Sequence, residues 1–171
     1  MAQSAHMIDL ARLSLRPGQA ARLDLEIDPG GLEFGGSEYR VDGGAVETRL
    51  DISRTATGYA LRLRFSDPLA GPCMRCLEPA RVAVEVDARE VDQPSVEDEE
   101  LLSPYVEEGI LDLRGWARDA LALALPSQIL CRDQCAGLCP VCGGSLNDAD
   151  PDAHQHPAEP DPRWAKLREL Q

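Results

Sequence analysis

The stretch 61-LRLRFSDPLAGPCMRCLEPARVAVEV-86 places a patterned segment on each side of a closely spaced pair of cysteines. Apolar residues occupy every second position of both segments: Leu61, Leu63 and Phe65 in the first, and Val82, Val84 and Val86 in the second. Alternation of this kind gives a strand one apolar face and one face in water. The stretch therefore predicts two antiparallel strands that flank Cys73 and Cys76.

The period-two pattern continues upstream of this stretch. Leu23, Leu25 and Ile27 alternate with charged residues after the turn signal Pro17-Gly18. Glycine-rich segments at 29–36 and 43–44 interrupt the pattern, and such segments commonly separate strands. We therefore predict an antiparallel β-sheet over residues 8–91.

Residues 93–110 carry a run of carboxylates and no basic residue. Repulsion among these charges, together with Pro94 and Pro104, opposes compact structure. The segment is predicted to be an acidic linker or loop. An acidic surface for a basic partner is the alternative interpretation.

A helix is predicted over residues 111–126. Asp112 can cap its N-terminus and Pro126 prevents its continuation. Apolar residues recur along one helical face, which should lie across the sheet. These residues are Leu113, Trp116, Ala117, Ala120, Leu121 and Ala124.

A second helix is predicted over residues 161–171. Asp161 is its capping residue, Pro162 suits the first helical position, and Trp164, Leu167 and Leu170 follow three apart. So short a helix is marginal alone in water, so we expect it to dock, either on its own domain or on a partner.

The chain of 171 residues is strongly acidic, with 17 Lys plus Arg against 30 Asp plus Glu and a formal net charge of −13. Bulk electrostatics at this charge oppose binding to nucleic-acid backbones. Asp9, Arg12 and Arg16 interrupt any signal-peptide core, and no apolar run is long enough to span a membrane. We expect a cytoplasmic protein with reduced thiols, in which closely spaced cysteines are metal ligands rather than disulfides.

Four closely spaced pairs of potential metal donors lie along the chain. They are Cys73 with Cys76, Cys131 with Cys135, Cys139 with Cys142, and His154 with His156. Structural zinc takes four nitrogen or sulfur donors, and closely spaced donors can bind one ion without strain. The eight donors therefore predict two structural zinc ions. The segment 139-CPVCGG-144 has the form of a zinc knuckle, whose glycines let backbone N–H groups turn toward the sulfurs.

Distance along the chain indicates how the pairs combine. The histidines follow the knuckle directly, which favours one zinc held by Cys139, Cys142, His154 and His156 and, by elimination, one held by Cys73, Cys76, Cys131 and Cys135. The converse pairing, in which CMRC joins the knuckle, remains open, as do histidines that bind nothing. A thioredoxin-like redox role for CMRC is disfavoured, because that motif begins a helix after a βαβ strand.

The two zinc sites would be closed, whereas a catalytic zinc keeps an open position. The sequence also contains no Gly-rich phosphate loop, no G-x-S-x-G and no H-E-x-x-H. We therefore expect a protein that is not an enzyme.

The predicted fold class is α+β: an antiparallel β-sheet or partial barrel with one packed helix and a zinc-knuckle C-terminal segment. Residues 1–92 form the β region with the first C-x-x-C, and 93–110 form the acidic linker. The helix over 111–126 leads to a cysteine/histidine zinc module over 127–160, and the C-terminal helix occupies 161–171.

Four motifs along the chain form a recognisable series. They are CMRCLEP at 73–79, LDLRGWARDALALALP at 111–126, CRDQCAGLCPVCGGSLN at 131–147 and DPRWAKLREL at 161–170. In this order they resemble the YceD-like family of bacterial proteins over residues 73–170. Many relatives end the knuckle with a C-x-C pair where this chain has His154 and His156.

The resemblance implies a role in ribosome biogenesis, namely in the accumulation of large-subunit (23S) ribosomal RNA, with zinc as scaffolding. One hypothesis is contact with a ribosomal protein or a large-subunit assembly intermediate, with no membrane and no small-molecule substrate involved. The other is direct RNA binding by the zinc module. Between residues 131 and 159 only Arg132 is basic, which argues against phosphate contacts there. Arginines gather only at Arg62 with Arg64 and at Arg75 with Arg81, where an RNA contact is conceivable.

Overall fold

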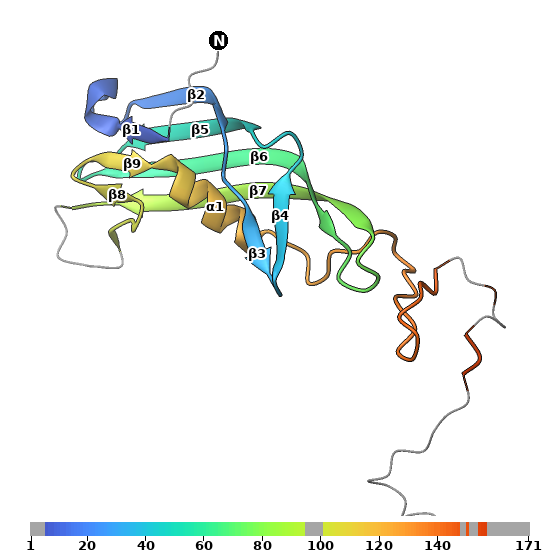
Figure 1. The fold of residues 1–171 in the computed structure, drawn as a ribbon. Coiled ribbons are helices and arrows are strands. Elements are labelled where there is room, and N and C mark those ends of the chain that lie inside the picture. The colour runs from blue at the N-terminus through green and yellow to red at the C-terminus, as the bar shows by residue number, and fades with distance from the viewer. Residues whose placement is uncertain (1–5, 95–100, 148–149, 151–153, 157–171) are drawn as a thin grey trace, which may run out of the picture.

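The computed structural model describes residues 6–94, 101–147, 150 and 154–156. Its central feature is the hairpin of β6 (Tyr59–Pro72) and β7 (Pro79–Asp92), which pair antiparallel along their whole lengths. Figure 1 shows the two strands running side by side to a shared tip. The predicted strands on either side of Cys73 and Cys76 are thus confirmed.

The other strands of the main sheet lie along one side of β6. β5 (Val46–Arg54) pairs with the first half of β6, and β4 (Ser37–Val41) pairs with the second half. β2 (Ala20–Ile27) pairs with β5, and β3 (Leu32–Phe34) pairs with β4. The sheet is open, because β2 and β7 do not pair within the described ranges.

Glycines shape the turns of this sheet. Gly43 and Gly44 have positive φ angles in the turn between β4 and β5, where a break is predicted. Gly35 and Gly36 also have positive φ, as the two-residue turn of a tight hairpin requires. The predicted break at 29–36 is wrong at β3, because a strand of three residues is too short to show alternation.

A second, three-stranded sheet is built from distant segments. β1 (Met7–Asp9) pairs with β9 (Ile110–Asp112), which pairs with β8 (Val106–Glu107), and the 3-10 turn η1 (Leu10–Leu13) follows β1. The sequence predicts an acidic linker over 93–110, whereas the structure has β8 and the start of β9 in the last part of this range. Val106 and Glu107 form β8 and pair with β9, and Ile110 in β9 pairs with Asp9 of β1. The next residue of β9, Leu111, is fully buried. A local run of charged residues cannot indicate that this segment pairs with a strand about a hundred residues earlier in the chain.

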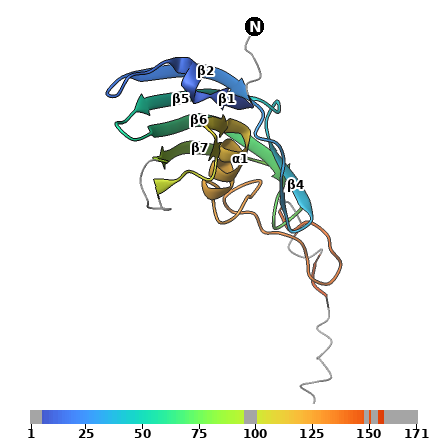
Figure 2. The same cartoon turned by 90° about the vertical axis from the view of Figure 1, so that its left-hand side faces the viewer.

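The single helix of the described chain, α1 (Leu113–Leu123), begins directly after β9. Asp112 caps it by accepting a hydrogen bond from the Gly115 N–H at 2.9 Å, as the sequence predicts. The helix lies against one face of the curved sheet (Figure 2) and buries Trp116 there. The predicted helix and the α+β class are confirmed.

The core lies between α1 and the sheet and is mainly aliphatic, with Leu50, Ile52, Leu63 and Leu69 fully buried. Within the described residues, no helix is long and apolar enough to cross a membrane. The predicted helix over 161–171 lies outside the described residues. After α1 the chain runs past the tip of the β6–β7 hairpin (Figure 1), and this passage positions the cysteines.

Candidate metal centres

Four cysteine sulfurs converge at the tip of the β6–β7 hairpin. Cys73, Cys76, Cys131 and Cys135 place these sulfurs within 4.8 Å of one another. The Cys73 and Cys135 sulfurs are 3.7 Å apart, and those of Cys76 and Cys131 are 3.5 Å apart. Tetrahedral zinc with Zn–S bonds of about 2.3 Å separates two sulfurs by roughly 3.8 Å, whereas a disulfide joins them at about 2.0 Å. The donor set and its spacing fit a closed tetrahedral site, here named the first cluster.

Local hydrogen bonds shape the loop that supplies Cys73 and Cys76. The Cys73 N–H donates to the Glu78 carbonyl at 2.7 Å, and the Leu77 N–H donates to the Cys73 carbonyl at 3.0 Å. The Arg75 N–H points at the Cys73 sulfur at 3.4 Å. Such N–H donors stabilise a thiolate and orient it toward a metal.

The other two cysteines are held against this loop by the segment that follows α1. The Met74 N–H donates to the Ile129 carbonyl at 2.9 Å, and the Ile129 side chain is fully buried. Cys131 and Cys135 then lie on a turn in which the Cys135 N–H donates to the Arg132 carbonyl. The first cluster thus joins the sheet to the segment after the helix.

Two thiols of the first cluster, those of Cys73 and Cys131, have pKa values shifted in opposite directions. For Cys73, desolvation by burial is outweighed by hydrogen bonds from the backbone N–H groups of Arg75 and Cys76, and its pKa falls to about 6. For Cys131, desolvation and the neighbouring thiols raise the pKa to about 12. The Cys73 sulfur therefore favours the thiolate form that binds a cation, and the Cys131 thiol would release its proton on binding a metal.

A second cluster of four donors combines the two cysteines of 139-CPVCGG-144 with two histidines that come later in the chain. Cys139, Cys142, His154 and His156 place their donor atoms within 4.8 Å of one another, with the Cys142 sulfur 3.3 Å from His154 Nδ1. The Gly143 N–H donates to the Cys139 carbonyl at 2.9 Å. Hydrogen bonds from the backbone N–H groups of Cys142 and Val141 lower the pKa of Cys139. The knuckle therefore stabilises a thiolate at Cys139.

The histidine side of the second cluster carries two features that fit a metal. His156 Nε2 is buried and has no hydrogen-bond partner, and a buried nitrogen of this kind is costly unless it binds something. Gly144 leaves the space that the His154 ring fills, because a Cβ at Gly144 would lie 2.8 Å from His154 Cε1. Two sulfurs and two imidazoles form a common donor set for structural zinc.

The structure groups the eight predicted donors in the favoured combination, and the converse pairing of CMRC with the knuckle is not observed. The surroundings of the donors were not predicted. The contact between Met74 and Ile129 and the close fit of Gly144 to His154 depend on tertiary structure, which no local motif encodes.

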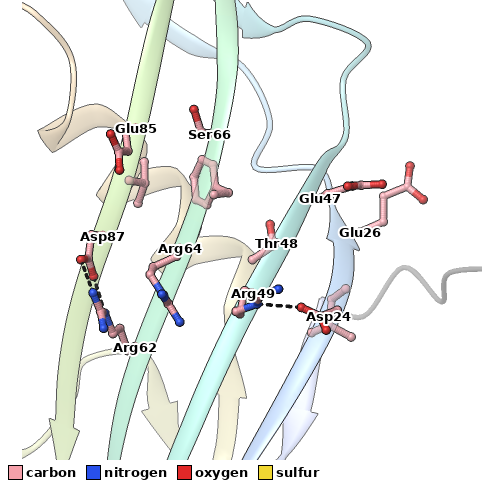
Figure 3. Close-up of a pocket in the computed structure, with 13 residues that line it drawn as sticks. Asp24, Glu26, Glu47, Thr48, Arg49, Arg62, Arg64, Ser66, Glu85 and Asp87 are labelled. Carbon is pink, nitrogen blue, oxygen red and sulfur yellow. Dashed lines mark hydrogen bonds and ion pairs between the residues drawn. The ribbon is translucent and has the colours of Figure 1, made fainter.

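A second candidate surface is the face of the main sheet opposite α1, which carries a shallow depression of about 710 Å³. Figure 3 shows arginines and aspartates from neighbouring strands side by side across it. Arg62 donates to Asp87 at 2.6 Å, Arg49 donates to Asp24 at 3.0 Å, and Arg64 pairs with Asp51. The arginine cluster predicted at 62 and 64 is therefore neutralised by carboxylates.

Asp51 accepts from two arginines. Hydrogen bonds from Arg22 at 2.6 Å and from Arg64 outweigh desolvation and lower its pKa. The second predicted arginine cluster is partly neutralised as well, because Arg81 pairs with Asp42 at 2.8 Å, while Arg75 makes no ion pair with another described residue. The sheet face thus presents alternating charges and not a continuous basic surface.

The fold and the two donor clusters define a class of protein: a small α+β protein with an antiparallel sheet, whose hairpin tip and following segment carry two candidate structural metal sites. The chain belongs to the YceD family. The family model described as "Large ribosomal RNA subunit accumulation protein YceD" matches residues 61–171. The family resemblance noted from the sequence is thereby confirmed.

The chain is also similar to uncharacterized proteins of mycobacteria. A protein of Mycobacterium tuberculosis (strain H37Rv) is 37% identical over 175 residues, covering 95% of this chain and 80% of the relative. A protein of Mycobacterium leprae is 28% identical over 170 residues, covering 96% of this chain and 76% of the relative. No solved structure matches the chain.

Proposed function

We propose that this protein is a non-enzymatic, zinc-binding factor of the bacterial cytoplasm that supports large-subunit biogenesis and 23S ribosomal RNA accumulation through a protein partner. The family's role in large-subunit RNA accumulation supports the biological process. The two closed donor clusters support the metal. The partner would be a ribosomal protein or a large-subunit assembly intermediate.

The zinc ions would be structural. In the first cluster, Cys73 and Cys76 would hold the hairpin tip, and Cys131 and Cys135 would hold the segment after α1 on the same ion. In the second cluster, Cys139 and Cys142 would be closed by His154 and His156. Zinc with four protein donors supplies folding free energy and no open coordination position.

The ion pairs between arginines and aspartates are the observation that favours a protein partner over RNA. A protein that neutralises phosphates needs unpaired cations on one surface. Here Arg22, Arg62 and Arg64 contact aspartates across the sheet, and the chain as a whole has a net charge of −13. Basic proteins are the partners that such a surface attracts at long range.

The metal is tested by elemental analysis of protein purified without chelator, where two zinc ions per chain are expected. His154→Ala combined with His156→Ala should reduce this to one ion. Metal-free wild-type protein, or an unchanged count in the double variant, would contradict the assignment.

The function is tested in two steps. Deletion of the gene should reduce mature 23S RNA without reducing its transcription. The purified zinc-bound protein should then bind large-subunit proteins, and not naked 23S fragments, at physiological salt. Tight RNA binding that Arg75→Ala or Arg81→Ala abolishes would instead support direct RNA recognition.

A further inference from the structure

The face of the main sheet opposite α1 carries its charged side chains in rows that run across the strands. The middle row balances two arginines with two aspartates, in the order Asp24, Arg49, Arg64 and Asp87. The row on one side of it has three arginines and one aspartate, in the order Arg22, Asp51, Arg62 and Arg89. The row on the other side is acidic, because Glu26 lies opposite Glu47, and Ser66 lies opposite Glu85. The face is therefore basic at one end and acidic at the other.

The three glutamates, here named the acidic row, have no cation to balance them. The ion pairs of the face belong to the other two rows, and no described residue forms an ion pair with Glu26, Glu47 or Glu85. All three side chains are exposed. Glu26 and Glu47 occupy directly opposite positions of β2 and β5, where like charges destabilise a sheet. A cation bound at this row would relieve that repulsion.

The shape of the face suits an extended segment. All three glutamates line the shallow depression of about 710 Å³, and Figure 3 shows them toward one end of it, with the arginines toward the other. The row crosses β2, β5, β6 and β7, and neighbouring strands lie about 4.8 Å apart, so it is about 14 Å long. An extended peptide covers that length with about five residues, and its alternate side chains point to the same side.

We propose that the acidic row is the docking surface for an extended segment of the protein partner, rich in lysine or arginine, whose basic side chains pair with Glu26, Glu47 and Glu85. Charge complementarity identifies this occupant, since unpaired carboxylates attract cations and repel the phosphates of a nucleic acid. The arginines at the opposite end of the face would repel the same segment and so fix its position. The inference rests on the proposed function for the existence of a protein partner, and it adds the surface that the partner contacts.

The test compares two triple variants of the full-length, zinc-loaded protein. The acidic-row variant combines Glu26→Gln, Glu47→Gln and Glu85→Gln, which keep the size of each side chain and remove its charge. We expect it to fold, because it removes the repulsion between Glu26 and Glu47. The matched control makes the same change in net charge at exposed positions outside the depression. Its substitutions are Glu33→Gln, Glu107→Gln and Glu108→Gln. Thermal unfolding checks that both variants are folded.

The first probe is a fluorescein-labelled synthetic peptide of alternating lysine and serine, and its binding is measured by fluorescence anisotropy. We expect the acidic-row variant to bind this peptide about tenfold more weakly than the wild type, and the control variant to stay within about twofold of it. Added salt should weaken the wild-type binding, because it screens exposed charges. The second probe is the set of purified large-subunit ribosomal proteins, tested one at a time. The same loss is expected in the acidic-row variant for each protein that the wild type binds.

Equal peptide binding by the two variants, or none by the wild type, would overturn the docking surface. The proposed function would still stand if the wild type bound a large-subunit protein. A large-subunit protein that the acidic-row variant binds as tightly as the wild type does would also overturn the surface, as would a labelled single-stranded RNA whose binding the acidic-row variant loses. Peptide binding that depends on the acidic row, without binding to any large-subunit protein, would support the surface and contradict the proposed partner.

Discussion

Gly144 is not one of the four donors of the second cluster, but the position of the His154 ring depends on its small size. Its φ is not in the positive range, so its role is spatial: a Cβ there would lie 2.8 Å from His154 Cε1 and 3.5 Å from the Cys142 sulfur. We expect Gly144→Ala to displace the His154 ring and to lower the zinc content from two ions to one. Elemental analysis of the purified variant measures the count.

The control for this variant is Val141→Ala in the same knuckle. Val141 is 69% exposed, so shortening its side chain should leave both zinc ions in place. Two ions in Gly144→Ala would show that the histidine ring can shift without losing the metal.

Asp51 links the strands of the charged face through two arginines. Hydrogen bonds from Arg22 and Arg64 keep the pKa of Asp51 below its ordinary value. A lowered folded-state pKa stabilises the fold above the unfolded pKa, and this contribution is lost as the pH falls through the folded one. Asp51→Asn should therefore lower the free energy of unfolding by about 1 kcal/mol at neutral pH and by much less in strong acid.

Urea unfolding of the wild type and the variant at both pH values measures this difference. Asp24→Asn is the comparison, because Asp24 is 69% exposed and Arg49 is its one ion-pair partner among the described residues, so a smaller effect is expected. Equal losses at neutral and acidic pH would show that Asp51 acts through packing and not through its charge.

At the scale of the elements, the two clusters have different structural roles. The first joins the β6–β7 hairpin to the segment after α1 and includes buried Cys135, whereas the second closes an exposed knuckle through Cys142. Cys135→Ser should lower the free energy of unfolding by ~3 kcal/mol or more, because it would remove the proposed metal that joins two elements. Cys142→Ser should cost less than ~1 kcal/mol in the unfolding of the sheet.

Chemical denaturation followed by tryptophan fluorescence measures both variants, because Trp116 lies in the core between α1 and the sheet. Metal analysis should show one ion in each. Similar losses of stability in the two variants would contradict the separate roles.

The elements differ in how far the sequence predicts them. Long strands such as β6 and β7 can be predicted from the local sequence, because apolar and polar residues alternate over many positions. The helix α1 can be predicted in the same way from its capping residue and its apolar face. The donors could be named and grouped because closely spaced cysteines and histidines have few other uses when the thiols are expected to stay reduced. β8 and β9 could not be predicted, because β9 pairs with β1, about a hundred residues away in the chain, and β8 pairs only with β9.

At the scale of the whole molecule, we expect the ion pairs of the sheet face to prevent its arginines from binding RNA phosphates. Arg22 and Arg64 form ion pairs with Asp51, and Arg62 forms one with Asp87. Asp51→Asn combined with Asp87→Asn would release these arginines, and we expect the double variant to bind RNA where the wild type does not. Its log affinity should fall with log salt, with a slope of about −0.7 for each phosphate contacted.

Fluorescence anisotropy with a labelled single-stranded RNA over a range of salt measures this binding. Glu107→Gln combined with Glu108→Gln is the matched control, since it changes the net charge equally at the exposed end of β8 and in the turn that follows it. Equal RNA binding by the two double variants would show that net charge, and not the released arginines, is responsible.

The long β6–β7 hairpin also has a consequence for how a newly synthesised chain matures. Its contacts are close in sequence, and local contacts of this kind form quickly. Cys73 and Cys76 therefore leave the ribosome and take up their positions well before Cys131, which lies 55 residues after Cys76. The first cluster can close only after the intervening small sheet and helix have been made. With zinc bound as proposed, metal acquisition would be a late step of biosynthesis, and a zinc-starved cell should accumulate chains with a finished sheet whose segment after α1 is not joined to the hairpin.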